Sequence, residues 1–569
     1  MMKDKRHIFY LISIVMMLAL VLTACGGATP TPEEPEDVTA PEVEEEEVAE
    51  PEEEVAAECG EDGTIIIAYD GDIDHVELMQ FRSIAAYDAT ANLYEPLIQQ
   101  ELVDQGDRIF IGSENFVGAG AESYDVSEDG TVYTFNLRED AMFADGTSIT
   151  ANDYYYTLKR ALEGPGYITL LTGFMAVDSM EQVEVVDDYT LQITAHQPAA
   201  LAEIILSFQV LGAISEATAE EHATADDPWA EEWFRTNSNS SGPYVITGWN
   251  PGVEYVFEPN PNYWRGADYF KNCKVIFRVV PDASTREQLL RAGDVDVALG
   301  VPFSDLEELA ADPDITIHNI PTTRTYHAGM NQTQPPFDDV RVREAISLAV
   351  PYAAITDNVI YGYGDNPGSP IAEGMVTHTK EFFDFDQGTV EEAKALLTEA
   401  GYPDGFEIDI VVPQEDQARV DAAVWIQSGL AEIGVTLNIN ALPVAQYQQV
   451  LDAIDENGAH TLPFYIFEWY SWGNDPAFQF TWNFKCGQWT NYAMVCNEEI
   501  DQIIADLTSS FDPAEREALS KRGQEIVVQE EIPWVHLYAP DWIVATRSNI
   551  DGIALFNDLT LRYAFLEKH

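Results

Sequence analysis

The chain has 569 residues, of which 46% are hydrophobic and 11% aromatic, so it can bury large cores and is not a globally disordered protein. By length it holds roughly three to four folding units. Lys and Arg total 28 against 99 Asp and Glu, and the resulting formal net charge of −71 repels phosphate backbones and anionic lipid headgroups. Nucleic acid is therefore excluded as a partner, and five Cys in this length exclude a disulfide-dense miniprotein.

The amino terminus has the pattern of an export signal. Lys3, Lys5 and Arg6 precede an uncharged, mostly apolar run over residues 8–22, which is short for a membrane span but typical of a signal peptide. The run ends in Leu-Thr-Ala-Cys, which resembles a bacterial lipobox and implies lipid attachment at Cys25 with cleavage before it. The alternative is an ordinary secretory signal with an incidental Cys. We expect an extracytoplasmic protein, periplasmic or on the cell surface, that touches the membrane only through this lipid anchor.

An acidic segment follows the signal peptide, which we assign to residues 1–24. From residue 26 to 62 the chain is rich in Pro, Glu, Val, Ala and Thr, with 16 acidic residues and no basic ones. Such a composition buries too little apolar surface to offset the entropy lost on ordering. We therefore predict that residues 25–62 form a lipidated Cys and a disordered tether. A formal charge of about −57 remains in residues 63–569, so the folded body is acidic as well.

Strand and helix signals alternate through the body. Short runs rich in β-branched and aromatic residues predict strands, and apolar residues at helical spacing predict helices. The predicted strands are 64–69, 133–137, 190–195, 275–280, 295–299, 326–330, 406–412 and 435–439, and the predicted helices are 154–162, 284–293, 390–400 and 419–433. No internal repeat is visible, and the alternation indicates an α/β protein of at least two lobes.

Capping motifs mark two of these helices. Ser284 with Glu287, and Thr389 with Glu392, have the spacing of a capping box, in which each side chain bonds the other residue's backbone N–H. Gly401 follows the second helix at the position where a left-handed residue commonly ends a helix.

Residues 133–162, with the sequence YTFNLREDAMFADGTSITANDYYYTLKRAL, strongly resemble the signature of the large extracellular solute-binding proteins of family 5. This family contains the oligopeptide-, dipeptide- and nickel-binding receptors of ABC importers. The resemblance continues in the family's order at 93–97 (LYEPL), 241–244 (SGPY), 260–266 (NPNYWRG), 281–296, 331–345, 391–406 and 532–543. It covers nearly the whole body.

The resemblance implies two α/β lobes of the periplasmic-binding-protein type, joined by two crossover strands, with a third subdomain inserted in the first lobe. The implied boundaries are 63–321 and 533–569 for lobe I, about 105–235 for the inserted subdomain, 322–532 for lobe II, and crossovers near 321–323 and 530–533. In such a fold the ligand lies between the lobes and touches both only when they close, so binding shifts the population toward the closed form.

The resemblance therefore implies a monomeric receptor that captures peptides and delivers them to the permease subunits of an ABC importer. Within the same fold, an oligosaccharide or a metal complex is the alternative cargo, because aromatic platforms also stack on sugars. From another class, an extracytoplasmic hydrolase is a remote alternative.

The densest aromatic segment of the chain spans residues 464–492, with 12 aromatic residues in 29. In peptide-binding relatives a Trp followed three residues later by Asp lies in the cleft, where the carboxylate pairs with the ligand's amino terminus. Trp472 and Asp475 match that spacing, and a desolvated carboxylate suits an ammonium. The alternative is that Asp475, which precedes Pro476, caps a helix that has Pro at its first position.

Four further residues are weaker ligand candidates. Trp469 and Tyr470 either line pockets for ligand side chains or pack the lobe. Asn331 matches the family's cleft-facing start of the second lobe, or is a plain turn residue. Tyr94 lies at the cleft edge or in the core.

The resemblance implies one disulfide, and the oxidising compartment permits it. Dipeptide-binding relatives have a disulfide comparable to a Cys486–Cys496 pair. That leaves Cys59 and Cys273, each preceding a predicted strand of the first lobe, as a second pair.

Enzyme motifs are missing from the sequence. It has no GxSxG, HExxH, Walker A, GxGxxG or CxxC pattern, and no two of its ten His have metal-like spacing. Glycosidases use a pair of carboxylates, but in a chain with this many Asp and Glu residues such a pair does not indicate an active site. We expect a protein that is not an enzyme and that has no metal site and no cofactor.

Overall fold

The computed structural model of the chain describes most of the residues after the predicted tether. The described ranges are 63–80, 83–106, 109–166, 168–471, 473–556 and 560–569. The signal peptide, the tether, Cys25, Cys59 and Trp472, all named above, lie outside them.

A seven-stranded sheet contains the first strand of the body. Its order is β12–β19–β11–β1–β10–β9–β8. The strands are β1 (Thr64–Tyr69), β8 (Tyr244–Asn250), β9 (Glu254–Pro259), β10 (Lys274–Val279), β11 (Val297–Leu299), β12 (Ile315–Ile320) and β19 (Trp542–Arg547). The central strand β1 has the bounds that the sequence predicts and pairs in parallel with β10 and β11. Ile65 and Ile67 are fully buried, as a strand covered on both faces requires.

A six-stranded sheet forms the second large layer, with the order β14–β18–β13–β17–β15–β16. Its strands are β13 (Arg324–Met330), β14 (Gly364–Asp365), β15 (Glu407–Pro413), β16 (Thr436–Leu442), β17 (Phe464–Tyr470) and β18 (Trp534–Pro540). β15 and β16 are parallel and are connected by helix α13 (Gln417–Glu432), so the βαβ unit predicted around residues 406–439 is present.

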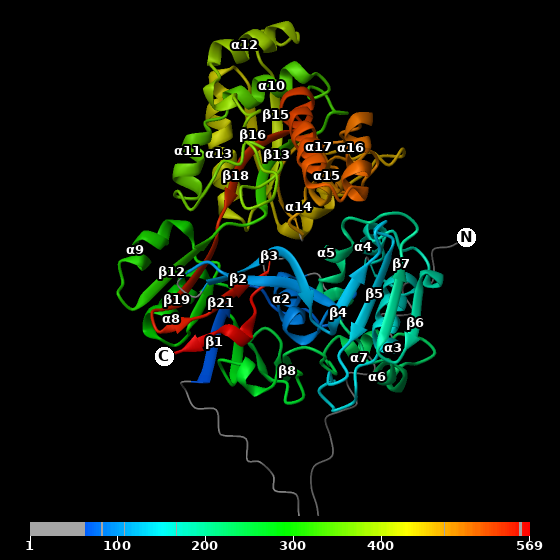
Figure 1. Cartoon of the computed structure of the whole chain (residues 1–569). Helices are drawn as coiled ribbons and strands as arrows, with labels where there is room; N and C mark the ends of the chain where they lie inside the picture. Colours follow the sequence, from blue (N-terminus) through cyan, green and yellow to red (C-terminus); the bar gives the residue numbers. More distant parts are fainter. Residues whose placement is uncertain (1–62, 81–82, 107–108, 167, 472, 557–559) are drawn as a thin grey trace, which may run out of the picture. The chain divides into compact units, whose positions relative to one another are not determined.

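Two connections carry the chain between these sheets. Residues 321–323 lead from β12 to β13, where the sequence analysis placed the first crossover. The second connection leads from β18 to β19. β18 still pairs with β13 after Pro533, so the chain reaches the seven-stranded sheet at β19, after Asp541 (Figure 1).

Smaller sheets fill the segment predicted as an inserted subdomain and the carboxyl end. The strands are β2 (Ile98–Asp104), β3 (Ile109–Gly118) and β21 (Ile553–Leu555) in one sheet, β4 (Ala121–Val126), β5 (Val132–Leu137), β7 (Thr190–Thr194) and β6 (Val183–Asp187) in another, and β20 (Ile550–Asp551) with β22 (Glu567–Lys568) in a third. β21 pairs in parallel with β3, so the carboxyl end packs beside the start of the inserted segment.

Helices flank the sheets (Figure 1). They are α2 (Ile84–Leu93), α3 (Ala151–Glu163), α4 (Thr169–Phe174), α5 (Ala202–Leu206), α6 (Glu216–His222), α7 (Glu231–Phe234), α8 (Ala283–Ala292), α9 (Leu306–Ala310), α10 (Val340–Ala349), α11 (Tyr352–Val359), α12 (Val390–Glu399), α14 (Val444–Leu451), α15 (Pro476–Phe484), α16 (Glu498–Ser509) and α17 (Pro513–Glu525), besides α13.

One predicted capping box is present and the other is wrong. At α12 the Thr389 hydroxyl accepts from the Glu392 N–H at 3.2 Å, and the Glu392 carboxylate accepts from the Thr389 N–H at 3.0 Å. At α8 the cap is Asp282, which accepts from the backbone N–H of Thr285 at 2.8 Å. Asp282 takes the cap position in place of Ser284, and Glu287 instead pairs with Arg291 one turn later.

Candidate functional site

Three of the predicted ligand residues, Trp469, Tyr470 and Asp475, lie at the end of β17 and the start of α15. Trp469 and Tyr470 are the last two residues of β17, and both are half-buried. Tyr470 pairs in register with Arg324, and Trp469 with Thr325, on β13. Because neighbouring residues on a strand face opposite sides, Trp469 and Tyr470 lie on different faces of the sheet.

Asp475 is the N-cap of α15. Its Oδ1 accepts a hydrogen bond from the backbone N–H of Ala477 at 2.8 Å, and its Oδ2 pairs with the guanidinium of Arg516 on α17. Only 7% of the residue is exposed. Burial raises the pKa of Asp475, while Arg516 and the Ala477 N–H offset part of that rise. The capping alternative thus describes this position, and the contact with a ligand amine stays a prediction.

The residue before this cap bonds to a distant strand. Nδ2 of Asn474 donates to Oε1 of Glu114 on β3 at 2.6 Å, and Oδ1 of Asn474 accepts from the backbone N–H of Val376 at 2.8 Å. Burial raises the pKa of Glu114 to about 7, the Asn474 bond lowers it, and the charge of Asp475 raises it. The carboxyl groups of Glu114 and Asp475, which come from different parts of the chain, therefore lie close together here. Of these two, only Asp475 has an ion-pair partner among the described residues.

Most aromatic residues of α15 are packed inside rather than displayed. Phe478 is 2% exposed, and its ring stacks on Phe174 of α4 with centroids 4.7 Å apart. Nearby, the backbone N–H of Ala200 donates to the Thr508 carbonyl of α16 at 2.9 Å. Helices α15 and α16 thus both contact the segment predicted as an inserted subdomain. Trp469 differs, because its buried Nε1 has no acceptor among the described residues.

Two of the predicted ligand residues are interior. Asn331 is fully buried, and its Nδ2 donates to the carbonyl of His460 at 2.8 Å while its Oδ1 accepts from Thr333. It therefore closes a turn. Tyr94 is 2% exposed and belongs to the first hydrophobic core. The turn and core alternatives describe these two positions.

The sequence analysis did not single out Glu114, Arg324 or Tyr69. Arg324 begins β13 directly after the first crossover, and Tyr69 ends β1. The charge of Arg324 lowers the pKa of Tyr69, which burial and then Asp70 raise, so the two side chains are near each other. A charged residue at a strand end beside a predicted crossover was the available signal for Arg324. Nothing in the sequence signals Glu114.

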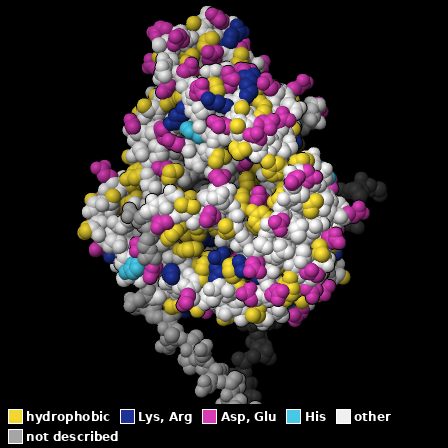
Figure 2. Space-filling view, viewed as in Figure 1, with side chains coloured by type: hydrophobic (Ala, Val, Ile, Leu, Met, Phe, Trp, Pro, Cys, Tyr) yellow, Lys and Arg dark blue, Asp and Glu magenta, His cyan; other side chains and the backbone are white. Residues whose placement is uncertain are grey.

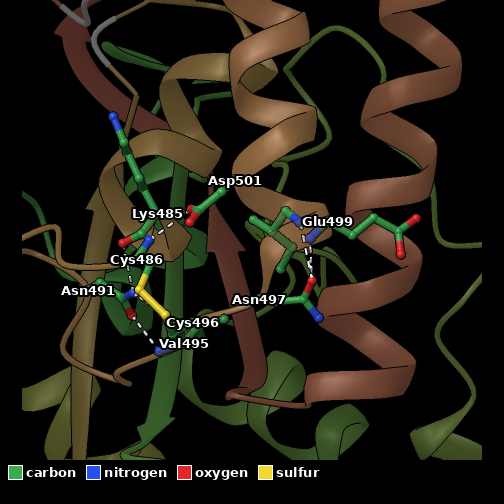
Figure 3. The surroundings of a disulfide bond; sticks show 9 residues. Lys485, Cys486, Asn491, Val495, Cys496, Asn497, Glu499 and Asp501 are labelled. Carbon is green, nitrogen blue, oxygen red and sulfur yellow. Dashed lines mark hydrogen bonds between the residues drawn. A yellow bond between two sulfur atoms is a disulfide. The ribbon is translucent and has the colours of Figure 1, made fainter.

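A disulfide joins Cys486 and Cys496 in the loop between α15 and α16, with Cα atoms 4.5 Å apart (Figure 3). The loop is further held by the Cys486 N–H, which donates to Oδ1 of Asp501 at 3.0 Å. Asn491 spans the loop, because its Nδ2 donates to the Val495 carbonyl at 2.7 Å. The pair is the one that the resemblance implied. Cys273 is also disulfide-bonded, and Cys59 lies outside the described residues.

Breaking the Cys486–Cys496 crosslink is expected to lower the free energy of unfolding by about 2–3 kcal/mol, because a closed loop of this length restricts the unfolded chain. The measurement is urea unfolding of Cys486→Ser and of the double variant Cys486→Ser/Cys496→Ser. Both variants should lose the same amount, since either breaks the bond. A much larger loss in the double variant would assign the effect to side-chain packing instead.

Two surface hollows and the search for metal sites concern other parts of the described residues. Surface hollows of about 470 and 550 Å³, lined respectively by residues near Asn260 and near Asn438, contain none of the predicted ligand residues. Within the described ranges, no cluster of three or more His, Cys, Asp and Glu side chains is arranged to hold a metal ion. In that same part of the chain, no helix has the length and apolarity to cross a membrane.

Comparison with known proteins gives consistent matches. The family model for bacterial extracellular solute-binding proteins, family 5 Middle, matches residues 115–491. The glutathione-binding protein GsiB of Escherichia coli K12 is 26% identical over 442 residues, covering 77% of this chain and 83% of that protein. Di/tripeptide-binding protein 2 of Pseudomonas aeruginosa is 28% identical over 466 residues, covering 78% and 84%.

Solved structures share the fold. The Helicobacter pylori periplasmic binding protein DppA, in complex with the peptide STSA, has a TM-score of 0.75 and 22% identity, with 89% of this chain and 98% of that chain covered. The dipeptide-binding protein of Pseudoalteromonas sp. SM9913, in complex with Met-Leu, has a TM-score of 0.74 and 21% identity, with coverages of 89% and 100%.

Proposed function

The chain belongs to the bacterial extracellular solute-binding proteins of family 5, and we propose that it is the receptor of an ABC importer that captures short peptides. The observation that carries the proposal is the match to peptide receptors along most of the chain. The relatives named above bind glutathione, di- and tripeptides, a tetrapeptide and a dipeptide. We further propose a monomer held outside the cytoplasm by a lipid on Cys25, which hands its cargo to permease subunits.

The proposed lobes follow the strand pairing. Lobe I comprises the elements around the seven-stranded sheet together with the inserted segment, and lobe II those around the six-stranded sheet. The peptide would lie where β17, the loop before α15, β1 and β3 approach one another. Contacts from both lobes to one ligand favour the closed arrangement by the difference in binding free energy between the two states.

The peptide's amino terminus is proposed to bind at Glu114 and Asp475. A carboxylate whose charge is incompletely compensated attracts an ammonium group, and the bond is charge-assisted. Glu114 supports this role because one of its oxygens bonds Asn474 and it has no ion-pair partner among the described residues. Trp472, Trp469 and Tyr470 are proposed to contact the first side chains of the peptide.

The test is calorimetric titration of the full chain in detergent, after unfolding and refolding to remove carried ligand. We expect Ala-Ala-Ala to bind and N-acetyl-Ala-Ala-Ala to bind at least tenfold more weakly, because acetylation removes the charge that the acids contact. Equal binding of the free and the acetylated peptide would support peptides as the cargo but would contradict the proposal that Glu114 and Asp475 bind the amino terminus. Binding of neither peptide would overturn the proposal and redirect the search to oligosaccharides and metal complexes.

A matched pair of variants tests Asp475 within that experiment. Asp475→Asn should lower the affinity for the free-amine peptide about tenfold and leave the acetylated peptide unchanged, since Asn still caps α15 but carries no charge. Asp512→Asn is the control, because Asp512 also caps a helix with Pro at its first position and lies at the surface. Equal affinities for the two variants would restrict Asp475 to its capping role.

A further inference from the structure

Strand β16 lies at one edge of the six-stranded sheet, next to β15. The two strands are parallel, and their register runs without a shift from Glu407 opposite Thr436 to Pro413 opposite Leu442. The sequence of β16, TLNINAL, contains no charged residue and no Pro. It is therefore a regular, uncharged edge strand in a chain of which 22% of the residues are charged.

The two ends of β16 show which of its backbone groups bond to β15. The Thr436 N–H donates to the Phe406 carbonyl at 2.8 Å, and the Leu442 carbonyl accepts from the Gln414 N–H, also at 2.8 Å. Backbone groups of successive strand residues point to opposite sides of the strand. Even-numbered residues of β16 therefore bond to β15, and residues 437, 439 and 441 face the open edge, which is the side of β16 away from β15.

The open edge is only partly covered. Nε2 of Gln427 on α13 donates to the Leu437 carbonyl at 2.6 Å. The N–H and C=O groups of Ile439 and Ala441 have no hydrogen-bond partner among the described residues. These groups are spaced to pair with one more strand.

Other edge strands carry features that hinder the addition of a strand. The register of β4, β6 and β8 is interrupted by a shift, and β4 and β6 also contain acidic residues. Such interruptions and charges are common protections of a sheet edge. β12 is regular like β16 and contains no Asp, Glu, Lys or Arg, but neither surface hollow is lined by its residues. The hollow beside β16 thus distinguishes this edge.

This hollow, of about 550 Å³, lies on one face of β15 and β16. Its lining includes Glu407 and Asp409, which are exposed and have no ion-pair partner among the described residues. Nδ2 of Asn438 donates to Oε1 of Glu407 and to Oδ1 of Asp409, at 2.9 Å in each case. One neutral amide between two carboxylates leaves both negative charges in place, so the hollow attracts a cationic group.

The opposite face of β16, which packs on α13, offers an apolar contact at the same edge. Val424 of α13 is 49% exposed and lies three residues before Gln427, which bonds to the Leu437 carbonyl. Residues three apart share one side of a helix, so Val424 is also directed toward the open edge. A strand added to β16 therefore meets carboxylates on one face and an apolar side chain on the other.

The charge of the chain favours a basic partner over a second copy. Asp and Glu side chains are scattered over the face shown in Figure 2 and outnumber Lys and Arg there. Two copies, each with a formal net charge of −71, repel each other. An added strand would lie about 10 Å from β15, since neighbouring strands are about 4.8 Å apart, and Lys or Arg side chains span most of that distance.

We propose that the open edge of β16 adds an extended segment of a partner polypeptide in which basic and apolar residues alternate. The backbone of the segment pairs with Ile439 and Ala441. Its basic side chains reach Glu407 and Asp409, and its apolar side chains contact Val424. This surface is separate from the proposed cargo site, so the failure of either proposal leaves the other standing.

The test is calorimetric titration of the full chain in detergent with acetyl-Lys-Val-Lys-Val-Lys-Val-amide. We expect this peptide to bind at least tenfold tighter than acetyl-Glu-Val-Glu-Val-Glu-Val-amide. At saturation, amide hydrogen exchange should slow at least tenfold at Ile439 and Ala441. Exchange at Asn438 and Asn440 should change little, because their N–H groups already bond to β15.

Two proline variants test the backbone pairing. Ala441→Pro removes an N–H that faces the open edge, so it should leave the midpoint of urea unfolding unchanged and weaken binding of the basic peptide at least tenfold. Asn440→Pro is the matched control for the direction of the N–H groups. It removes an N–H that bonds to β15 and should lower the urea midpoint.

A charge variant tests the hollow. Glu407→Gln/Asp409→Asn should weaken binding of the basic peptide by about fivefold or more. Glu220→Gln/Glu221→Gln removes the same charge from exposed positions of α6 and should leave the affinity unchanged.

Each outcome decides the question. The proposal is overturned if the basic peptide does not bind, if exchange at Ile439 and Ala441 does not slow, or if Ala441→Pro binds as well as the wild type. Equal binding of the acidic peptide overturns the stated chemistry of the partner. A dimer in sedimentation that Ala441→Pro dissociates would assign the edge to a second copy instead. If Ala441→Pro does not fold, hydrogen exchange in the wild type and the charge variant still decide.

Discussion

Replacing Arg419 by Met is expected to lower the free energy of unfolding by about 2–4 kcal/mol at pH 7. Arg419 is 8% exposed and lies between two acids, 2.8 Å from Oδ2 of Asp416 and 3.1 Å from Oε2 of Glu468. Removal of the guanidinium leaves these carboxylates without their direct partner. About a quarter of each acid side chain is exposed, which keeps the expected loss below the upper range for fully buried pairs.

The pH dependence of the free energy of unfolding shows whether the loss comes from the ion pair with Glu468. Burial raises the pKa of Glu468, but the charges of Arg419 and then Arg324 lower it by more than burial raises it. The resulting pKa is about 2. The folded state therefore holds Glu468 charged more readily than the unfolded state does. This contribution is present above pH 4.5 and is lost as the pH falls from 4.5 toward 2. In Arg419→Met the pKa of Glu468 rises. The difference in the free energy of unfolding between wild type and variant should therefore be smaller at pH 4 than at pH 7, by about 1 kcal/mol or more.

Urea unfolding at pH 7 and pH 4 measures both quantities. Arg341→Met is the matched control, because Arg341 is 43% exposed and pairs with Asp339 on the surface, where an ion pair contributes about 1 kcal/mol or less. Adding Glu468→Gln to Arg419→Met should recover part of the loss. A loss for Arg419→Met that equals the control and does not change with pH would contradict the argument.

Replacing Phe478 by Ala is expected to lower the free energy of unfolding by about 3–5 kcal/mol. Phe478 is buried on α15, stacked on Phe174 of α4 and edge-on to Phe208 at 6.3 Å. Truncation removes the transfer free energy of the ring and leaves a cavity between helices that are held by other contacts. Phe478→Leu should lose much less, because it fills most of the space.

Thermal and urea unfolding check this second result. The control is Phe511→Ala, since Phe511 is 47% exposed and its loss should be about 1 kcal/mol or less. Equal losses at Phe478 and Phe511 would mean that the α15–α4 contact does not stabilise the fold. A normal stability with altered peptide affinity would instead assign the contact to closure.

Local signals in the sequence predicted much of the fold. The run of β-branched residues at Thr64–Tyr69 gave the bounds of β1, and the Thr389–Glu392 pair gave the start of α12, because both depend on residues a few positions apart. The capping box predicted at Ser284 failed for a local reason, since Asp282 stood two positions earlier. The ordered set of motifs identified the family before any contact was known.

The candidate site was less predictable because its residues meet over long sequence distances. The Trp-x-x-Asp spacing at Asp475 matched a ligand contact and a helix cap equally well. Only the fold brings Arg516 to its carboxylate. Likewise Glu114 reaches Asn474 from a strand that the sequence could not pair with that loop.

The sequence by itself determined the α/β class, the family, most strand and helix positions and the acidic character of the body. These follow from composition, periodicity and caps, which act within a few residues. The tertiary structure decided that the aromatic segment packs against α4, that β18 pairs within the six-stranded sheet, and that Asp475 pairs with Arg516. Such outcomes depend on which distant side chains share a core or a charge, and burial and electrostatics set them only after the sheets have formed.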